Sequence, residues 1–172
     1  MKTLVIVAHP NLEQSKVNKR WVEELKGQPD VTVHDLYEAY PDEQIDVARE
    51  QQLMMEHDRI VFQFPFYWYS TPPLLKKWQD HVLTYGWAYG SEGNKLHGKE
   101  LLLAISTGSP QEAYHPDGMN QYTMEELLKP FHATSNLIGI QLLPYFIQHN
   151  AMSITDEDLN VSAREYVQAV RG

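Results

Sequence analysis

The chain has 172 residues, with 14 lysines and arginines against 23 aspartates and glutamates, and a formal net charge of −9. This length suits one hydrophobic core, so we expect residues 1–172 to form a single domain. The negative charge opposes contact with a phosphate backbone and argues against nucleic acid as a partner. Because the chain has no cysteine, thiol catalysis, thiolate metal sites and disulfides are excluded, and redox chemistry would need a cofactor.

The apolar runs of the chain bear on its location. The run between Thr3 and His9 is shorter than the apolar region of a secretory signal. No apolar window is long enough to predict a membrane-spanning helix. We therefore expect a cytoplasmic protein whose membrane contact, if any, is peripheral association.

The first half of the chain alternates between strand-like and helix-like segments. Leu4 to Ala8 is rich in leucine, valine and isoleucine and predicts a strand. Apolar residues at helical spacing from Val17 to Leu25 predict a helix, which Gly27 and Pro29 stop. The next segments predict a short strand over 31–36, a polar helix over 43–56 and a third strand over 59–64.

The second half continues the same alternation. An amphipathic helix is predicted from Leu74 to about Tyr85, and the prolines before it suit a first turn, where amides lack intrahelical acceptors. Further patterns predict a strand over 100–106, a helix over 121–137 interrupted at Pro130, a fifth strand over 141–147 and a final helix over 156–170. No internal repeat or low-complexity segment breaks the series.

Five apolar strands separated by helices define the expected fold. Parallel strands need crossover connections, so this order predicts a parallel sheet with helices on both faces. The sequence thus predicts an α/β, flavodoxin-like three-layer sandwich around a five-stranded parallel sheet. In such open sheets, ligands bind outside the carboxyl ends of the strands, near the reversal of strand order. The loops expected to meet there are 9–15, 65–71 and 107–118.

The loop after the third predicted strand is the most informative segment. Pro65 is followed by four aromatic residues, Phe66, Tyr67, Trp68 and Tyr69. A solvated turn does not display this much apolar surface without a flat partner to cover it, which favours a stacked planar ligand. A hydrophobic contact between subunits, which tyrosine and tryptophan also favour, is the alternative, and both roles can hold together.

The loop after the first predicted strand suits an anion. It leads from His9 directly into a helix, with Ser15 as a candidate N-cap and Asn18 as a further neutral donor. The unpaired amides and positive dipole end of a helix start favour a phosphate there. An ordinary serine cap is the alternative. The chain has neither a Walker loop nor the motif Gly-x-Gly-x-x-Gly. Their absence argues against a P-loop nucleoside triphosphatase and against a Rossmann dinucleotide site.

The loop after the fourth predicted strand combines a glycine with polar side chains. Gly108 permits close approach of a ligand to the backbone, and Tyr114 and His115 offer donors to charge that develops on it. A plain surface loop is the alternative.

Other chemistries find less support in the sequence. None of the eight histidines stands three or four residues from another, so no metal site is predicted. The serines lack the Gly-x-Ser-x-Gly frame of many acyl-transfer hydrolases. Trp21 and Trp78 lie at helical spacing and are predicted to be core residues.

Four motifs taken together resemble one family over nearly the whole chain. The motifs are His9-Pro10 with Ser15 and Asn18, Phe62-Gln63-Phe64-Pro65-x-x-Trp68-Tyr69, Lys76-x-Trp78, and Thr107-Gly108 with Tyr114. They resemble the flavin-dependent NAD(P)H:quinone oxidoreductases, which have a flavodoxin-like fold. The chain is most similar to the short bacterial branch, which includes general stress proteins and ancillary flavoproteins of glutathione-gated potassium efflux systems.

The resemblance implies a flavin at the carboxyl edge of the sheet. Positions that hold the phosphate and ribityl region match His9, Ser15, Val17 and Asn18. The segment along the isoalloxazine ring matches Pro65, Phe66, Tyr67, Trp68 and Tyr69, and the loop at its pyrimidine end matches Thr107, Gly108 and Ser109.

The resemblance also implies the catalytic residues. Tyr114 matches the family tyrosine that steadies the reduced ring, and it is the residue we expect to act in catalysis. The longer animal enzymes have a catalytic histidine several residues later, where this chain has Asp117-Gly118. His115, directly after Tyr114, is therefore the second catalytic candidate.

The implied reaction is a ping-pong transfer of two electrons. NADPH or NADH gives hydride to the flavin and leaves, and a quinone or similar flat acceptor takes its place. FMN is expected rather than FAD, because little polypeptide follows the last helix to enclose an adenosine.

The resemblance implies partners as well. Family members form homodimers whose flavin sites are completed by the partner, and the aromatics Trp68, Tyr69, Tyr85, Trp87 and Tyr89 suit such a surface. The alternative to an enzyme is a regulatory ancillary flavoprotein of a potassium efflux system, associated with a membrane transporter.

Overall fold

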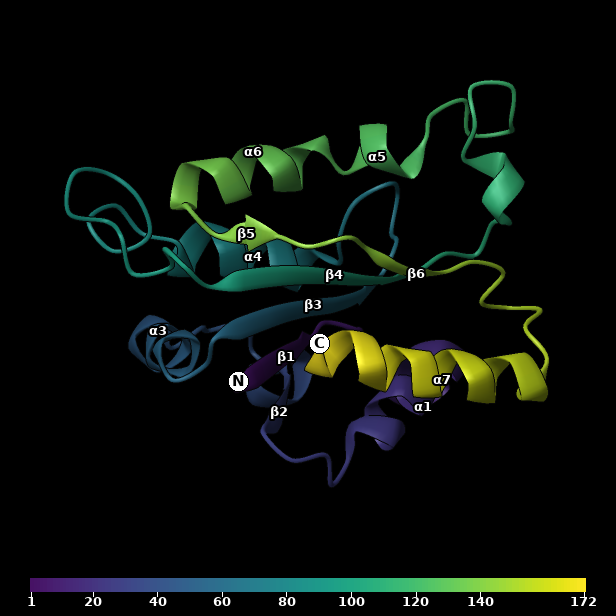
Figure 1. Cartoon of the computed structure of the whole chain (residues 1–172), viewed down its shortest axis with the longest axis horizontal. Coiled ribbons are helices and arrows are strands. Elements are labelled where there is room, and N and C mark those ends of the chain that lie inside the picture. The colour runs from purple at the N-terminus through teal and green to yellow at the C-terminus, as the bar shows by residue number, and fades with distance from the viewer.

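The computed structural model describes residues 1–172 and has the predicted three layers (Figure 1). All strand pairs are parallel, and the sheet order is β2-β1-β3-β4-β5, with β6 also beside β4. The strands are β1 (Thr3–Val7), β2 (Val31–Asp35), β3 (Arg59–Pro65), β4 (Glu100–Ser106), β5 (Gln141–Leu142) and β6 (Phe146–Gln148). The flavodoxin-like prediction is confirmed.

Helices cover both faces of this sheet. One face carries α1 (Lys16–Leu25) and α7 (Asp156–Arg171), which lie side by side at the lower right of Figure 1, at the level of β1 and β2. The other face carries α2 (Leu36–Ala39), α3 (Val47–Met55), α4 (Pro73–Val82), α5 (Met124–Leu127) and α6 (Lys129–Ile138). Two single turns, η1 (Leu12–Gln14) and η2 (Gln111–Ala113), lie in the loops after β1 and β4.

The central strands are apolar throughout because each face of the sheet packs against helices. Along β1 every residue is buried, and successive side chains join opposite cores. Leu4 and Ile6 pack toward α3, α4 and α6, whereas Val5 and Val7 pack toward α1 and α7. This arrangement fixes the register of β1 in the sheet. It therefore also fixes the point at which β1 ends and the site loop begins.

The predicted fifth strand over 141–147 is wrong as a single strand. Its two ends pair with β4, but between them three residues, 143–145, lie opposite only two residues of β4. The extra residue interrupts the strand as a β-bulge does. Pro144, within this interruption, has no backbone N–H to donate to a hydrogen bond with the neighbouring strand. The edge strand is thereby divided into β5 and β6.

Several predicted helix limits also need correction. The helix predicted from 43 begins at Val47, because the side chain of Asp46 caps it by accepting from the amide of Arg49. The short helix α2 was not predicted; Asp35 at the end of β2 caps it. The helix predicted over 121–137 is two helices, α5 and α6, with Pro130 in the first turn of α6.

The two tryptophans predicted to be core residues are fully buried, which confirms that prediction. The indole Nε1 of Trp21 donates to Ser162 Oγ at 3.1 Å, across the α1–α7 contact. The indole Nε1 of Trp78 donates to Glu50 Oε2 at 2.8 Å, between α4 and α3. No helix of the structure combines the length and apolarity that crossing a bilayer requires.

Candidate functional site

The main candidate pocket lies at the carboxyl edge of the sheet, where the loops after β1, β3 and β4 meet. The strand order reverses here, since β1 pairs with β2 on one side and β3 on the other. The pocket has a volume of about 480 Å³. Nine predicted cofactor-binding residues line it: His9, Ser15, Val17, Asn18, Pro65, Phe66, Tyr67, Thr107 and Gly108.

A smaller hollow of about 270 Å³ continues the site on the aromatic side. It shares Phe66 and Gly108 with the main pocket, so the two hollows adjoin. The remaining predicted cofactor residues, Trp68, Tyr69, Ser109 and Tyr114, line this second part. The structure therefore brings together every predicted site residue except His115.

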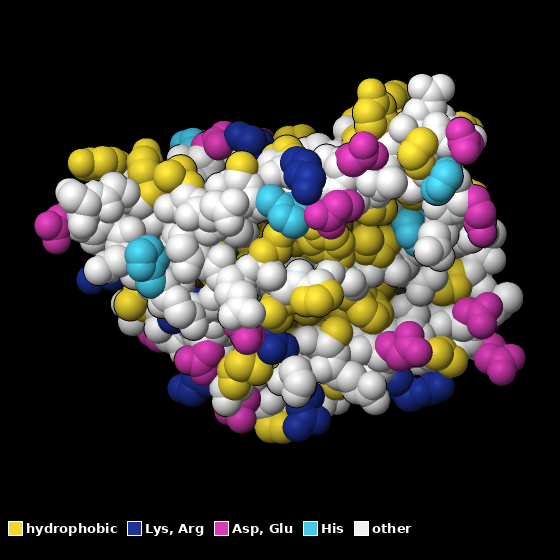
Figure 2. Space-filling model, turned by 45° about the horizontal axis from the view of Figure 1, so that its top comes forward, with side chains coloured by type: hydrophobic (Ala, Val, Ile, Leu, Met, Phe, Trp, Pro, Cys, Tyr) yellow, Lys and Arg dark blue, Asp and Glu magenta, His cyan; other side chains and the backbone are white.

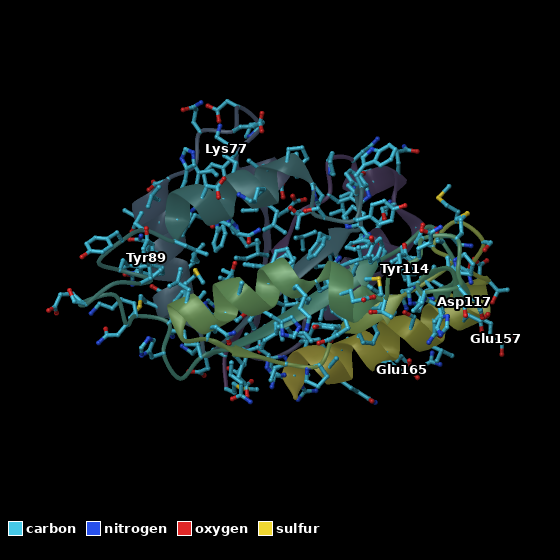
Figure 3. The ribbon with its side chains drawn as sticks, turned by 90° about the horizontal axis from the view of Figure 1, so that it is seen from above. Lys77, Tyr89, Tyr114, Asp117, Glu157 and Glu165 are labelled. Carbon is cyan, nitrogen blue, oxygen red and sulfur yellow. The ribbon has the colours of Figure 1, made fainter.

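His115 lies outside both hollows. Its side chain is exposed, and its Nδ1 accepts a hydrogen bond from the amide of Asp117 at 3.3 Å. In Figure 3, Tyr114 and Asp117 lie at the same end of the molecule. The position of His115 on the outer side of this turn gives no support to a catalytic role, which stays a prediction.

A larger hollow, of about 660 Å³, lies elsewhere, between α6 and the edge strand β5. Figure 2 shows hydrophobic side chains exposed along a depression of this face. Three of its polar side chains are engaged with one another: the Tyr145 hydroxyl donates to Glu125 Oε2 at 3.0 Å and also contacts His132, whereas the buried hydroxyl of Ser135 has no partner. Burial and the Glu125 carboxylate raise the pKa of Tyr145 to about 12. This hollow lies along the edge strand β5, away from the carboxyl ends of β1, β3 and β4, so we place the functional site at the carboxyl edge of the sheet.

The anchor end of the candidate site is the start of α1. Ser15 caps this helix, and its Oγ accepts from the amide of Asn18 at 3.1 Å. The first amides of a helix have no intrahelical acceptor, and the positive end of the helix dipole favours an anion in front of them. Ser15, Val17 and Asn18 are all at this start, which makes it suitable for a phosphate.

A chain of buried polar side chains supports the anchor end from behind. Asn18 Nδ2 lies 3.2 Å from Ser15 Oγ and 2.9 Å from Ser106 Oγ. Gln63 Nε2 lies 3.1 Å from the backbone carbonyl oxygen of Asn18, and Tyr166 OH lies 2.9 Å from Gln63 Oε1. Each of four side chains in this group is at most 4% exposed, so solvent does not compete for their hydrogen bonds. The four are Asn18, Gln63, Ser106 and Tyr166.

His9 borders the anchor end as a neutral side chain. Burial lowers its pKa below the ordinary value of 6.5. Its Nδ1 accepts from the amide of Asn11 at 3.0 Å, and its ring meets Tyr67 edge-on at 6.2 Å. The neutral ring therefore contributes shape and hydrogen bonding to the pocket near neutral pH, without a positive charge.

The aromatic end of the site is built on an unusual turn. Trp68 and Tyr69 both have positive φ, at 46° and 62°, and backbone hydrogen bonds between Tyr67 and Ser70 close the turn around them. A left-handed conformation is unfavourable for side chains of this size. Trp68 is 93% exposed, so the packing of its side chain within this chain does little to compensate for that conformation.

Tyr114 is positioned by contacts from two other loops. Its ring meets Phe66 edge-on at 6.1 Å and lies 5.3 Å from the ring of His149. His149 Nδ1 is also 2.7 Å from Thr107 Oγ1. Burial lowers the pKa of His149 below 6.5, although the charge of Glu112 opposes the shift.

His149 and Ser106 are site residues that the sequence reasoning missed. His149 follows the fifth predicted strand, so its loop ends at the same edge of the sheet as the three loops considered. The rule that ligands bind at the carboxyl ends of parallel strands could therefore have identified His149 from the sequence. Ser106 ends the predicted strand over 100–106 and is absent from the predicted cofactor-binding residues, whereas it lines the pocket.

Comparison with known proteins gives the family. Residues 1–170 match the sequence profile of the family described as having a flavodoxin-like fold. The chain belongs to this family. It is 61% identical over 171 residues to general stress protein 14 of Bacillus subtilis (strain 168), covering 98% of both chains.

Further relatives carry more specific names. The chain is 56% identical to the uncharacterized NAD(P)H oxidoreductase YrkL of Bacillus subtilis (strain 168), covering 99% of this chain and 98% of that one. It is 46% identical to the glutathione-regulated potassium-efflux system ancillary protein KefG of Pectobacterium carotovorum, covering 96% and 90% of the two chains. The predicted resemblance to NAD(P)H oxidoreductases and to potassium-efflux ancillary proteins is confirmed.

A solved structure agrees with this grouping. General stress protein 14 of Treponema denticola, crystallised in complex with FMN, superposes with a TM-score of 0.95 at 44% identity and covers 99% of this chain and 98% of that one. The chain is thus a member of a family of flavoprotein NAD(P)H oxidoreductases.

Proposed function

We propose that this protein binds FMN at the carboxyl edge of its sheet and transfers two electrons from NADPH or NADH to a quinone or similar flat acceptor. The observation that carries the proposal is the pair of adjoining hollows, which form two unlike ends of one site. One end offers helix amides and neutral hydroxyl and amide donors, and the other offers aromatic rings. A flavin mononucleotide has a phosphate at one end and a planar ring at the other.

The residues at each end fit their parts of FMN. His9, Ser15, Val17 and Asn18 would hold the phosphate and the ribityl chain, since they surround the start of α1. Pro65, Phe66, Tyr67, Trp68 and Tyr69 would lie along the ring, and Thr107, Gly108 and Ser109 would contact its pyrimidine end. FMN is preferred to FAD because the Treponema denticola relative was solved with FMN.

The protein contributes binding, orientation and charge stabilisation to the reaction. When bound, FMN supplies the redox chemistry by accepting hydride and passing two electrons on. Tyr114 is held against Phe66 and His149 at the ring end, where its hydroxyl can donate a hydrogen bond to negative charge that develops on the reduced ring. His149 acts behind it as a positioning group and is itself held by Thr107 Oγ1.

The shape of the ring end supports a ping-pong order. The aromatic side chains around it offer one stacking surface, because Trp68 and Tyr69 sit on the same turn beside Tyr114. A nicotinamide and a quinone are both flat, and each would need this surface. The oxidised nicotinamide would therefore leave before the acceptor enters.

The direct test is the colour of the purified protein. We expect a visible flavin spectrum, and mass spectrometry of the compound released by heat should identify FMN. Anaerobic NADPH or NADH should bleach the spectrum, and a quinone should restore it without a ternary complex. Colourless protein that takes up neither FMN nor FAD at micromolar concentration would contradict the proposal.

We also propose a homodimer that completes the site. Trp68, Met119 and Met152 beside the pocket are 93%, 76% and 88% exposed, more apolar surface than a pocket rim needs alone. Tyr85 is 71% exposed, and Tyr89 lies at the opposite end of the molecule from Tyr114 (Figure 3). A two-fold dimer can bring these two surfaces together. Light scattering after size exclusion should give twice the chain mass; a monomer at micromolar concentration would contradict it.

A regulatory role is the second candidate, and the KefG relative is the observation that favours it. In that case the protein would associate with a membrane transporter from the cytoplasm, and reductase activity would be incidental. Co-purification with a potassium efflux protein, together with quinone turnover too slow for a metabolic enzyme, would support the regulatory role. Rapid NAD(P)H-dependent quinone turnover by the isolated protein would favour the enzyme.

We further propose that residues 1–172 are a single folding domain. One sheet runs through the structure, and both hydrophobic clusters pack against it. Urea unfolding of the flavin-free protein should therefore give one transition by both circular dichroism and tryptophan fluorescence.

A further inference from the structure

We propose that a buried hydrogen-bond relay from Tyr166 through Gln63 to Asn18 orients the hydroxyls of Ser15 and Ser106 as a pair of donors to the flavin phosphate. This inference rests on the proposed function and adds Ser106 as a binding residue and Gln63 and Tyr166 as positioning residues. The relay connects α7, β3 and α1, elements far apart in the sequence, and ends in the pocket.

The first step fixes the amide of Gln63. Its side chain is fully buried, and one of its terminal atoms lies 3.1 Å from the backbone carbonyl oxygen of Asn18. A carbonyl oxygen only accepts, so the atom facing it must be the Gln63 nitrogen. Gln63 Oε1 then faces Tyr166 at 2.9 Å, and the Tyr166 hydroxyl must donate to it.

The second step fixes the orientation of the Asn18 side-chain amide in the same way. Gln63 Nε2 has a second hydrogen, and Asn18 Oδ1 lies 3.3 Å from that nitrogen. The oxygen of the Asn18 amide therefore points back toward Gln63. Asn18 Nδ2 points forward, toward Ser15 Oγ at 3.2 Å and Ser106 Oγ at 2.9 Å, and donates to both.

The third step determines where the serine protons go. Ser15 Oγ already accepts from the Asn18 amide as the helix cap and from Asn18 Nδ2. Ser106 Oγ accepts from Asn18 Nδ2. Both oxygens thus use lone pairs inward, and both hydroxyl hydrogens remain available on the pocket side, which both residues line.

The charges around the pocket make these hydroxyls important. Lys16 also lines the pocket, but its Nζ donates to the carbonyl oxygen of Ile154 at 2.6 Å and lies 3.3 Å from the Asp156 carboxylate. Lys19 is 2.8 Å from Glu13. Because the nearby cations are engaged, an anion at the start of α1 depends on helix amides and oriented neutral donors.

Two variants test the relay, Ser106→Ala and Gln63→Met, with fluorescence titration of FMN and riboflavin. Ser106→Ala removes one donor, and Gln63→Met keeps the volume but breaks the relay. Each should raise the Kd for FMN about tenfold, since a hydrogen bond to a charged group is lost or misdirected. The Kd for riboflavin, which lacks the phosphate, should change less than twofold.

Ser162→Ala is the matched control. Ser162 is also a buried hydroxyl between α1 and α7, where it accepts from Trp21, but it takes no part in the relay. Its loss should lower stability and leave the ratio of the two flavin affinities unchanged. If Gln63→Met does not fold, Tyr166→Phe, which removes the hydroxyl that donates to Gln63 Oε1, tests the relay in its place.

The outcomes separate this inference from the function beneath it. An FMN-specific loss supports the relay. An unchanged FMN affinity, an equal loss for both flavins, or wild-type protein that binds FMN no tighter than riboflavin overturns the relay and leaves the flavin assignment standing. Wild-type protein that binds neither flavin overturns both.

Discussion

The anchor end and the aromatic end of the candidate site are built in opposite ways. At the anchor end, Asn18, Gln63 and Ser106 are buried and connected by hydrogen bonds. At the aromatic end, Trp68 and Tyr69 stand on a turn with positive φ and are 93% and 45% exposed. The first is prepared for its ligand by the fold alone, whereas the second has apolar surface still to be covered.

This difference separates the end that would hold the flavin phosphate tightly from the end at which the flat substrates would exchange. A phosphate that stays bound through many turnovers benefits from donors fixed in advance, because no entropy of ordering is lost on binding. A surface that must admit a nicotinamide and then another flat molecule has to remain open. Substitutions at the anchor end should therefore act on flavin affinity, and substitutions at the aromatic end should act on rate.

The largest effect should come from Asn18→Asp. A carboxylate at this position would accept hydrogen bonds from Ser15 and Ser106, turning their protons away from the pocket, and would add a negative charge beside the phosphate. We expect the Kd for FMN to rise about 100-fold or more by fluorescence titration. Asn120→Asp makes the same charge change beside Tyr69 at the aromatic end and should cost less than about threefold. Equal losses would remove the distinction between the two ends.

Tyr114→Phe should act on rate alone. Loss of the hydroxyl removes a donor to charge on the reduced ring, so hydride transfer from NADPH or NADH should slow about tenfold in stopped-flow absorbance. Flavin affinity should not change. Tyr122→Phe, at an exposed tyrosine outside both hollows, is the matched control. Unchanged reduction rates in Tyr114→Phe would remove Tyr114 from the mechanism.

Trp68→Asn should stabilise the flavin-free protein while impairing turnover. Asparagine tolerates a positive φ better than tryptophan, which relieves about 1 kcal/mol of backbone strain and should raise Tm by about 2–4 °C. Thermal denaturation followed by circular dichroism measures the change. Tyr122→Asn is the matched control, because it removes an exposed aromatic side chain at a position whose φ is not positive. It should not raise Tm. A fall in Tm for Trp68→Asn would show that the turn is not strained.

The smallest effect should be a pH dependence from His149. Burial lowers the pKa of His149 in the folded state below its ordinary value of 6.5, so the unfolded chain binds a proton first as the pH falls. Its contribution to stability is therefore present above about pH 6.5 and decreases as the pH drops through the folded pKa. His149→Gln should flatten the loss of urea midpoint between pH 7.5 and pH 5.5, and His115→Gln, at an exposed residue, should not. Parallel curves for wild type and His149→Gln would contradict this account.

Much of the fold was predictable because its signals are local. The apolar segments of β1, β3 and β4 and the helical spacing of α1, α4 and α7 lie within continuous stretches, and the structure confirms those elements. The errors fall where a local pattern competes with a longer-range effect. The edge strand is divided at Pro144 because its register against β4 changes, and α3 begins late because Asp46 caps it.

The sequence alone determined the elements, their alternation and the loops that meet at the carboxyl edge, because hydrophobic periodicity and parallel topology constrain these without any long-range detail. Only the tertiary structure decided that His149 lies against Tyr114, that His115 points away, and that Gln63, Asn18 and Ser106 form one connected chain. Hydrogen-bond direction depends on which buried atoms come within about 3 Å of each other, and residues 45 or 88 positions apart give no local sign of such contact.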